Sequence, residues 1–371
     1  KILFAENPGI VIQVKDKYKE EVKKILEDAG IGYVKLGKPT EERHILVEKG
    51  DATYQFGIDY LRDVWYSTSY LLDRKQSMNG CAKKRFENYK KQPLEFVFDK
   101  SFTGKLSQFG LNPDRRTPTG IKAAIIREKG TNGEREMAYM LYLAGFDVKD
   151  VTMTDLVSGR ETLEDINFIV FCGGFSNSDV LGSAKGWAGG FLFNEKAKKA
   201  LDNFYARPDT LSLGICNGCQ LMIELNLINP DFTKKAKMLH NDSHKFESKF
   251  VGVTVPMNRS VMFGSLSGSK LGIWVAHGEG KFSLPYHEDK YNVVLKYSYD
   301  EYPGNPNGSD YSVAGLASPD GRHLAMMPHL ERSCFPWQNA YYPADRIKND
   351  QITPWMEAFV NARKWIEMNK K

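Results

Sequence analysis

Strand-like and helix-like segments alternate between residues 121 and 225, and this alternation restricts the possible folds more than any other feature of the chain. The strand-like runs are nearly continuously apolar, as expected of strands buried on both faces, and they cover residues 121–127, 165–172 and 211–215. The helix-like segments cover residues 135–144, 186–205 and 219–225. This order predicts an α/β fold with a doubly wound, mainly parallel sheet of the flavodoxin-like class, flanked by helices.

Two further sets of segments lie outside this region. Strands linked by turns are predicted at residues 250–256, 273–276, 293–297 and 323–327. Before residue 90, a small α+β unit is predicted, with strands at 10–14, 32–36 and 44–48 and helices at 19–29 and 58–74. The second of these helices is amphipathic, and its apolar side chains are predicted to be buried: Leu61, Val64, Trp65, Leu71 and Leu72.

The length of 371 residues is about twice that of an ordinary domain, so we expect two cores. A polar stretch that ends in NPDRRTPTG separates them, because its proline and glycine residues disfavour regular structure. We therefore predict a first domain at residues 1–90, a linker at 91–119 and a second domain at 120–371. Because the chain begins at Lys1 rather than at a methionine, we expect it to be a piece of a longer protein.

Charge and hydropathy argue against nucleic-acid and membrane partners. The 51 basic and 46 acidic residues give a net charge of only +5, without a basic stripe. The sequence contains no apolar run of about 18 residues and does not start with a charged leader and an apolar core. We therefore predict a cytoplasmic location. The five cysteines, an odd number, favour reduced thiols over a disulfide framework.

Cys216 lies where a predicted strand turns sharply into a helix. The sequence Gly214-Ile-Cys216-Asn-Gly218 follows the strand at 211–215, and its glycines allow a tight turn. A thiol at the amino terminus of a helix is shifted towards the reactive thiolate by the partial positive charge there. The pattern predicts a nucleophile turn in which Cys216 is the nucleophile.

Cys216 and Cys219 also form a CxxC pair, which leaves other interpretations open. Such a pair occurs in thioredoxin-like redox proteins and as half of a zinc site. The sequence has no second CxxC and no nearby CxxH to complete a set of four zinc ligands. A further alternative is that both cysteines are buried structural side chains.

His329 and Glu331 supply a base and an acidic group that orients it. They follow the strand at 323–327, and in an extended segment the side chains of residues i and i+2 point to the same side. A thiolate nucleophile needs a base that returns a proton to the leaving group, and that base needs an orienting partner. We therefore predict a catalytic triad of Cys216, His329 and Glu331.

Gly173 and Gly174 directly follow the strand at 165–172. Glycines at the carboxyl end of a strand let backbone amides approach a ligand, as an oxyanion hole requires, and a plain turn is the alternative. Together with the amide of Asn217, just after the nucleophile, they are predicted to complete an acyl-transfer site.

The motif GxCxGxQ, which ends at Gln220, and the later HxE resemble the class I glutamine amidotransferases, whose triad is Cys-His-Glu. More narrowly, blocks from about residue 120 onward resemble the glutaminase domain of the phosphoribosylformylglycinamidine synthase family: GGFSNSDVLG, GWAGGFLFN, LGICNGCQLM, HNDSHKFESKF, AHGEGKF, YPGNPNGS and MMPHLER. FAENPGIVIQV and VWYSTSYLLDR resemble the end of the synthetase portion in the single-chain form of these enzymes.

The resemblance implies a glutaminase of de novo purine biosynthesis. Glutamine would be the substrate, Cys216 would form a γ-glutamyl thioester, and Gly173, Gly174, Asn217 and Gln220 would contact the oxyanion or the substrate. Ammonia would pass to upstream synthetase domains of the same chain, which use ATP and Mg²⁺ to convert formylglycinamide ribonucleotide to formylglycinamidine ribonucleotide. For the glutaminase domain itself, the resemblance implies no cofactor and no metal.

There are two departures from the family pattern: Leu330 stands where proline is common, and Asn177-Ser178 stands where Tyr-Gly is common. The first change bears on how rigidly the acidic residue of the triad is held, and the second on the loop beside the oxyanion hole. Ser243 and His277 either flank the glutamine pocket or are structural. A peptidase-like cysteine hydrolase of the same superfamily and an inactive binding module are the alternative functions.

Overall fold

The computed structural model of the protein describes residues 8–370. These residues form two compact units. The first unit ends at Trp65, and the second begins at Tyr66. This division by contacts falls earlier in the chain than the predicted domain boundaries at residues 90 and 120, which stay predictions.

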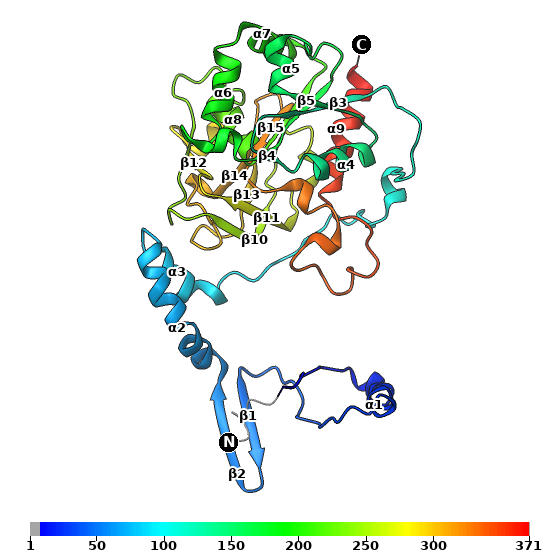
Figure 1. The fold of residues 1–371 in the computed structure, drawn as a ribbon, viewed down its shortest axis with the longest axis vertical. Helices are drawn as coiled ribbons and strands as arrows, with labels where there is room; N and C mark the ends of the chain where they lie inside the picture. The colour runs from blue at the N-terminus through cyan, green and yellow to red at the C-terminus, as the bar shows by residue number, and fades with distance from the viewer. Residues whose placement is uncertain (1–7, 371) are drawn as a thin grey trace. The chain divides into compact units, whose positions relative to one another are not determined.

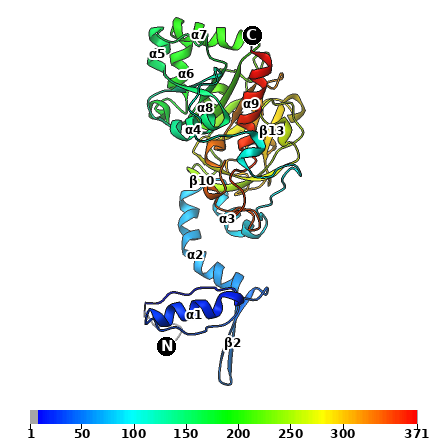
Figure 2. The ribbon, with the colours of Figure 1, turned by 90° about the vertical axis from the view of Figure 1, so that its right-hand side faces the viewer.

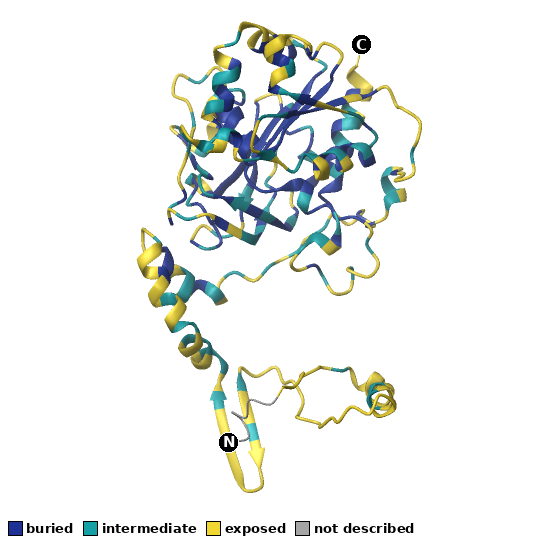
Figure 3. Cartoon of the chain, in the orientation of Figure 1, coloured by how far each residue is buried: buried dark blue, intermediate teal, exposed yellow. Residues whose placement is uncertain are grey.

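The first unit contains a 3-10 turn (Asp16–Tyr18), the helix α1 (Lys19–Asp28), an antiparallel hairpin of β1 (His44–Lys49) and β2 (Ala52–Gly57), and the start of a second helix. The strands expected at residues 10–14 and 32–36 are wrong, since both segments lack regular structure. A short apolar run becomes a strand only where a neighbouring strand accepts and donates its backbone hydrogen bonds. None of residues 8–65 is buried (Figure 3).

α2 (Ile58–Gln76) begins in the first unit and ends in the second, and it confirms the helix predicted at residues 58–74. The prediction that its apolar face is buried is wrong, because Trp65 is 79% exposed and Leu72 is 59% exposed. An amphipathic pattern determines which residues share a face of a helix. Whether that face is covered depends on the elements packed against it.

Within residues 66–370, nine strands form one sheet at the centre of the second unit (Figure 1). In spatial order the strands are β11 (Lys270–His277), β10 (Glu247–Thr254), β13 (Asn292–Tyr297), β14 (Val313–Ala317), β15 (His323–Met326), β8 (Leu211–Ile215), β6 (Phe168–Phe171), β3 (Lys122–Arg127) and β5 (Asp147–Thr152). The strands from β15 to β5 are parallel to one another, and those from β11 to β15 pair antiparallel. The α/β fold with a mainly parallel sheet is therefore confirmed: of the later predicted strands, β15 joins the parallel part, and β10, β11 and β13 belong to an antiparallel extension.

Two groups of helices accompany the parallel strands (Figures 1 and 2). One group is α4 (Glu134–Ala144) with α9 (Met356–Asn369), and the other is α5 (Met153–Ser158), α6 (Lys185–Leu192), α7 (Glu195–Ala206) and α8 (Asn217–Glu224). The single helix predicted at residues 186–205 is wrong, because α6 and α7 are separate. Asn194 starts the second of them, since its side chain accepts a hydrogen bond from Ala197 N at 2.9 Å.

Residues 66–119 pack on the rest of the second unit. The end of α2 and the short helix α3 (Cys81–Glu87) come first, and the backbone of Val97 then pairs with that of Lys270 in β11. Phe102 is only 5% exposed and joins the hydrophobic core, so the segment predicted as a linker also has a packing role. Across residues 8–370, no helix combines the length and apolar character needed to cross a bilayer.

The order of the parallel strands positions the candidate site. β6, β8 and β15 are neighbours and run in the same direction, so the segments that follow them meet at one edge of the sheet. Those segments carry Gly173, Cys216 and His329. Ligands of open α/β sheets bind beyond the carboxyl ends of such strands.

Candidate active site

Cys216 occupies the single residue between β8 and α8. Its backbone has φ +52° and ψ −105°, an unusual conformation for a residue with a side chain, which costs about 1–3 kcal/mol. Its backbone amide donates to Met326 O of β15 at 3.0 Å, which fixes the turn to the neighbouring strand. The Sγ atom lies 3.5 Å from Ala276 O. The sharp strand-to-helix turn predicted at Cys216 is therefore present.

The two glycines of the turn allow close backbone approach. A Cβ atom on Gly218 would lie 2.0 Å from Phe171 O in β6, and one on Gly214 would lie 2.5 Å from Gly218 O. Both distances are far below van der Waals contact, and the blocking atoms belong to the backbone. The spacing of glycines around Cys216 is therefore a packing requirement of this turn.

We expect Gly218→Ala to destabilise the second unit by about 1–3 kcal/mol, because the backbone of β6 or α8 must move to admit the methyl group. Urea unfolding followed by circular dichroism measures this change. Gly189→Ala in α6 is the matched control, since its Cβ would meet only Phe193 side-chain atoms, the nearest at 3.8 Å. Equal stability of the two variants would contradict the prediction.

His329 and Glu331 form a buried pair. His329 Nδ1 lies 2.7 Å from Glu331 Oε1, and each residue is 2% exposed. The predicted contact is present, but its expected geometry is wrong: the segment is not extended, because Leu330–Arg332 forms a 3-10 turn. The turn brings the carboxylate back to the ring. The His329 amide also donates to Trp274 O of β11 at 2.8 Å.

Opposite charges in this pair outweigh the effect of burial. Burial by itself lowers the pKa of His329, but the Glu331 carboxylate and the nearby Cys216 raise it to about 10. Burial raises the pKa of Glu331, yet His329, and then Arg332 at 3.6 Å, bring it below its ordinary value. His329 Nε2 is buried and has no hydrogen-bond partner of standard geometry within residues 8–370. The ring is therefore held through Nδ1, and its second nitrogen carries no such bond.

The predicted glycine pair lies against the side chains of Cys216 and His329. A Cβ on Gly173 would lie 3.0 Å from His329 Cε1 and 3.4 Å from Cys216 Cβ. Gly174 has φ +117°, and a Cβ there would lie 2.6 Å from Gly130 O. Only glycine fits this conformation and spacing without strain. The structure thus brings the glycine turn, the Cys216 thiol and the His329 imidazole together.

Asn217 and Gln220 connect the loops around the site. Asn217 Oδ1 accepts from Ser176 N at 3.1 Å, and its Nδ2 donates to Gln220 Oε1 at 2.9 Å. Gln220 Nε2 in turn donates to Glu279 O at 2.8 Å. Both side chains are buried, and this chain of bonds joins the glycine turn, α8 and the loop after β11. The predicted substrate contact of Gln220 stays a prediction beside this observed bridging role.

The two departures from the family pattern have different local settings. Asn177, Ser178 and Asp179 all have φ between +51° and +57°, a left-handed conformation that glycine adopts more easily than serine. Burial and then the charge of Glu279 raise the pKa of Asp179 in this loop. Leu330 is fully buried and starts the turn that carries Glu331. The turn forms without proline.

Ser243 and His277 are both buried and both have protein partners. Ser243 Oγ donates to Glu247 Oε1 at 2.6 Å, and His277 Nδ1 lies 3.3 Å from Asn241 Oδ1. Burial, followed by the charge of His329, lowers the pKa of His277 to about 3, so its ring is neutral at physiological pH. These contacts support a structural role for both residues.

The backbone carbonyls of β11 next to the site were missed by sequence reasoning. Trp274 O receives the His329 amide, and Ala276 O faces the Cys216 thiol. Backbone contacts leave no signature in residue type, and β11 is an edge strand that four other strands separate from β8. No pattern in the sequence could have identified these two positions.

The CxxC alternatives are disfavoured by the environment of Cys219. All five cysteines are free, and Cys219 is fully buried within α8. Burial raises the pKa of Cys219 well above its ordinary value. A buried thiol that resists ionisation is a poor partner in thiol–disulfide exchange.

Residues 120–366 match the CobB/CobQ-like glutamine amidotransferase domain, and this match covers more than half of the chain. The chain belongs to that family. It is 38% identical to phosphoribosylformylglycinamidine synthase of Homo sapiens over 98% of the chain and 29% of the relative. The corresponding enzyme of Drosophila melanogaster is 36% identical over 98% of the chain and 28% of the relative. The chain thus spans less than a third of the length of these curated relatives and corresponds to their carboxy-terminal portion.

A chain of the solved PurLQS structure from Thermotoga maritima is similar in fold, with a TM-score of 0.51 and 27% sequence identity. The similarity covers 68% of this chain and 99% of that chain. These comparisons confirm the predicted family and fold, whereas the roles of individual residues stay predictions. A relative from Arabidopsis thaliana, 38% identical over 98% of the chain, is described as chloroplastic/mitochondrial, and the predicted cytoplasmic location also stays a prediction.

Proposed function

We propose that this chain is the glutaminase part of a phosphoribosylformylglycinamidine synthase, which hydrolyses glutamine and supplies ammonia to a synthetase. The main observation in support of this proposal is the arrangement of the residues in the site. Cys216, His329 and the glycine turn at Gly173 follow three neighbouring parallel strands, in a domain of the amidotransferase family. The identity of 38% to the human enzyme over 98% of the chain supports the choice of that family member.

In the first half-reaction, Cys216 Sγ attacks the carboxamide carbon of glutamine. Backbone amides near Gly174 and Asn217 stabilise the negative charge that develops on the carbonyl oxygen. His329 Nε2 gives its proton to the departing nitrogen, so ammonia leaves and a γ-glutamyl thioester remains. The raised pKa of His329 supports this step, because the ring holds a proton to give.

In the second half-reaction, water replaces ammonia. Neutral His329 takes a proton from the water as its oxygen attacks the thioester carbon, and the C–S bond then breaks. Glutamate leaves, and Cys216 regains its starting form. Glu331 holds Nδ1 of the ring in both half-reactions and stabilises the imidazolium when it forms.

The acceptor reaction belongs to the same proposal. ATP and Mg²⁺ would bind in upstream synthetase domains, where ammonia converts formylglycinamide ribonucleotide to formylglycinamidine ribonucleotide with release of ADP and phosphate. Within residues 8–370, no three or more His, Cys, Asp or Glu side chains gather in a way that fits a metal ion.

Covalent labelling tests the proposal without requiring turnover. Intact-mass analysis after incubation with 6-diazo-5-oxo-norleucine, a glutamine-mimicking electrophile, should show one adduct that excess glutamine prevents. Peptide mapping should place the adduct on Cys216, and the Cys219→Ala variant should label as the wild type does. Labelling on Cys219, or no labelling of folded protein, would favour the redox or inactive-module alternatives. Labelling that glutamine does not prevent would favour a different cysteine hydrolase.

A further inference from the structure

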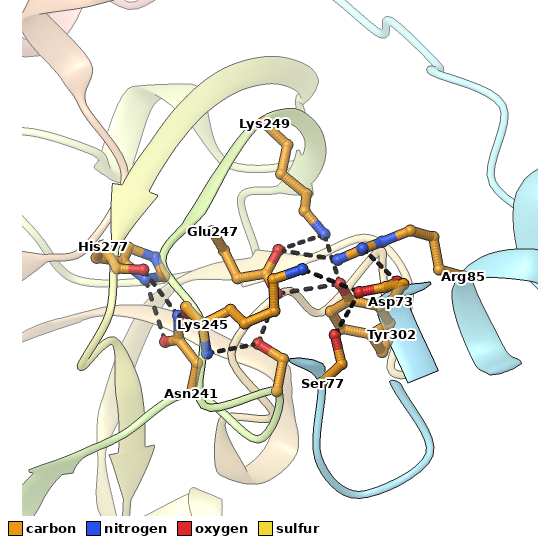
Figure 4. A network of polar contacts seen from close by, with 10 residues as sticks. Asp73, Ser77, Arg85, Asn241, Lys245, Glu247, Lys249, His277 and Tyr302 are labelled. Carbon is orange, nitrogen blue, oxygen red and sulfur yellow. Dashed lines mark hydrogen bonds and ion pairs between the residues drawn. The ribbon is translucent and has the colours of Figure 1, made fainter. Parts of the chain in front are cut away.

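A buried network of charged side chains joins the arm, defined as residues 66–90, to the bridging segment, defined as residues 241–247 (Figure 4). The arm contains the end of α2 and the helix α3, and the bridging segment leads into β10. The two parts are separated by about 150 residues in sequence, and both belong to the second unit.

Asp73 is the centre of this network on the arm side. It is 6% exposed and has three partners: Ser77 Oγ at 2.5 Å, Arg85 NH1 at 2.6 Å and Lys245 Nζ at 2.9 Å. The last of these partners lies in the bridging segment. A buried carboxylate with a full set of donors fixes the groups around it, whereas removal of its charge takes away the ion-pair partner that the partly exposed Arg85 and Lys245 share.

Backbone contacts add to this attachment. Met78 N donates to Ser243 O at 3.1 Å, and Asn79 Nδ2 donates to Asp242 O at 2.8 Å. Arg85 also lies 3.6 Å from Glu247, which accepts a hydrogen bond from Ser243 Oγ. The arm therefore holds the bridging segment along most of its length.

The opposite end of the bridging segment holds the end of β11. Asn241 Nδ2 donates to His277 O at 2.7 Å, and Asn241 N donates to Gly278 O at 2.9 Å. Asn241 Oδ1 accepts from Gly280 N at 3.0 Å. His277 directly follows Ala276, whose carbonyl oxygen lies 3.5 Å from Cys216 Sγ. The bridging segment thus fixes the backbone that faces the nucleophile.

The bridging segment also contacts the glycine turn. The ring centroid of Phe246 lies 5.9 Å from that of Phe175, which directly follows Gly174. Residues 241–247 therefore touch two of the loops that surround Cys216, one through hydrogen bonds and one through an aromatic contact.

We propose that Asp73 is a positioning residue for glutamine hydrolysis: through Lys245 and the bridging segment, the arm sets the placement of Ala276 and of the glycine turn around Cys216. This inference rests on the proposed function. Acyl transfer depends on the placement of reacting groups to a fraction of an ångström, so a contact outside the site can control the rate. Because the arm directly follows the first unit in sequence, it offers a route by which preceding parts of the chain influence the glutaminase.

The test compares inactivation of the chain by 6-diazo-5-oxo-norleucine in the wild type, Asp73→Asn and Asp73→Glu, with rates followed by intact mass. We expect Asp73→Asn to lower the limiting inactivation rate by about 10- to 100-fold and to change the half-saturating concentration little, because the glutamine contacts remain. Asp73→Glu keeps the charge and should recover most of the rate. A merely structural role would not produce this separation of rate from affinity.

The matched control is Glu161→Gln. Glu161 is also 6% exposed and pairs with a lysine, Lys149, but it lies between α5 and β6, away from the arm. Its variant should react at the wild-type rate. Lys245→Met provides a second test that leaves Asp73 paired with Arg85, and it should show the same loss of rate.

Equal inactivation rates for the wild type, Asp73→Asn and Lys245→Met, in proteins with unchanged thermal unfolding, would overturn the inference. A similar loss in Glu161→Gln would also overturn it, since the effect would then reflect general destabilisation. A wild-type chain that is folded but not labelled on Cys216 would instead refute the proposed function, so the two failures are distinguishable.

Discussion

Cys216→Ala should abolish glutamine hydrolysis and leave intact any ammonia-dependent reaction of the full-length protein. The variant has no sulfur to attack the carboxamide carbon, so the thioester cannot form, and we expect the rate to fall on the order of 10⁴-fold or more. The ammonia-dependent reaction should continue because it bypasses this step. Alanine fits the turn, since Cys216 is 5% exposed and the change removes only its Sγ atom.

Glutamate release from glutamine measures the first effect, and product formation from added ammonium salt in the full-length protein measures the second. Cys219→Ala is the control, because it removes the other cysteine of the CxxC pair, which is fully buried in α8. Retention of glutamine-dependent activity in Cys216→Ala would show that another group is the nucleophile. Loss of the ammonia-dependent reaction as well would indicate damage beyond the glutaminase site.

Glu331→Gln should lower the turnover number for glutamine by about 10²–10⁴-fold and move the alkaline limb of the pH profile to lower pH. In the wild type, the carboxylate and Cys216 hold the pKa of His329 at about 10 against the effect of burial. Glutamine at position 331 supplies no negative charge, while burial remains and lowers the pKa of His329. The imidazolium that protonates the leaving nitrogen is therefore lost at lower pH.

The pH dependence of glutamate release between about pH 6 and pH 11 measures this shift, since the range brackets the ordinary and raised pKa of histidine. Glu136→Gln is the matched control. Glu136 pairs with Arg332 at 3.7 Å, the same arginine that lies near Glu331, but Glu136 is not bonded to the imidazole. Its variant should keep the alkaline limb of the wild type. An unchanged alkaline limb in Glu331→Gln would show that the carboxylate does not control the protonation of His329.

The parts of this protein that sequence reasoning predicted well are those set by short segments. Residues 123–126 of β3 and all of β8 are buried, and apart from Ser212 these residues are isoleucine, leucine, alanine and glycine. Contacts within the turn at Cys216 or next to it leave no room for a side chain at Gly214 and Gly218. The glycine pattern of this turn could therefore be recognised from the sequence. The contact of His329 with Glu331 spans only two residues, although a turn rather than an extended segment makes it.

Predictions failed where the outcome depends on distant parts of the chain. The segments at residues 10–14 and 32–36 have the composition of strands, but they have no strand partner in the described chain. The apolar face of α2 is exposed at Trp65 and Leu72 although its pattern predicts burial. The composition of a segment determines which secondary structure it is able to form, and the surrounding structure decides whether that secondary structure forms and which face is buried.

The sequence by itself determined the fold class, the family and the residue types of the candidate triad, since these depend on local patterns and on motifs in a fixed order. Only the tertiary structure decided which strands are neighbours, and hence that Gly173, Cys216 and His329 meet at one edge of the sheet. It alone also placed Asp73 beside Lys245, 172 positions away in the chain. The physical reason is that strand pairing and buried ion pairs depend on the packing of the whole domain, which no short segment encodes.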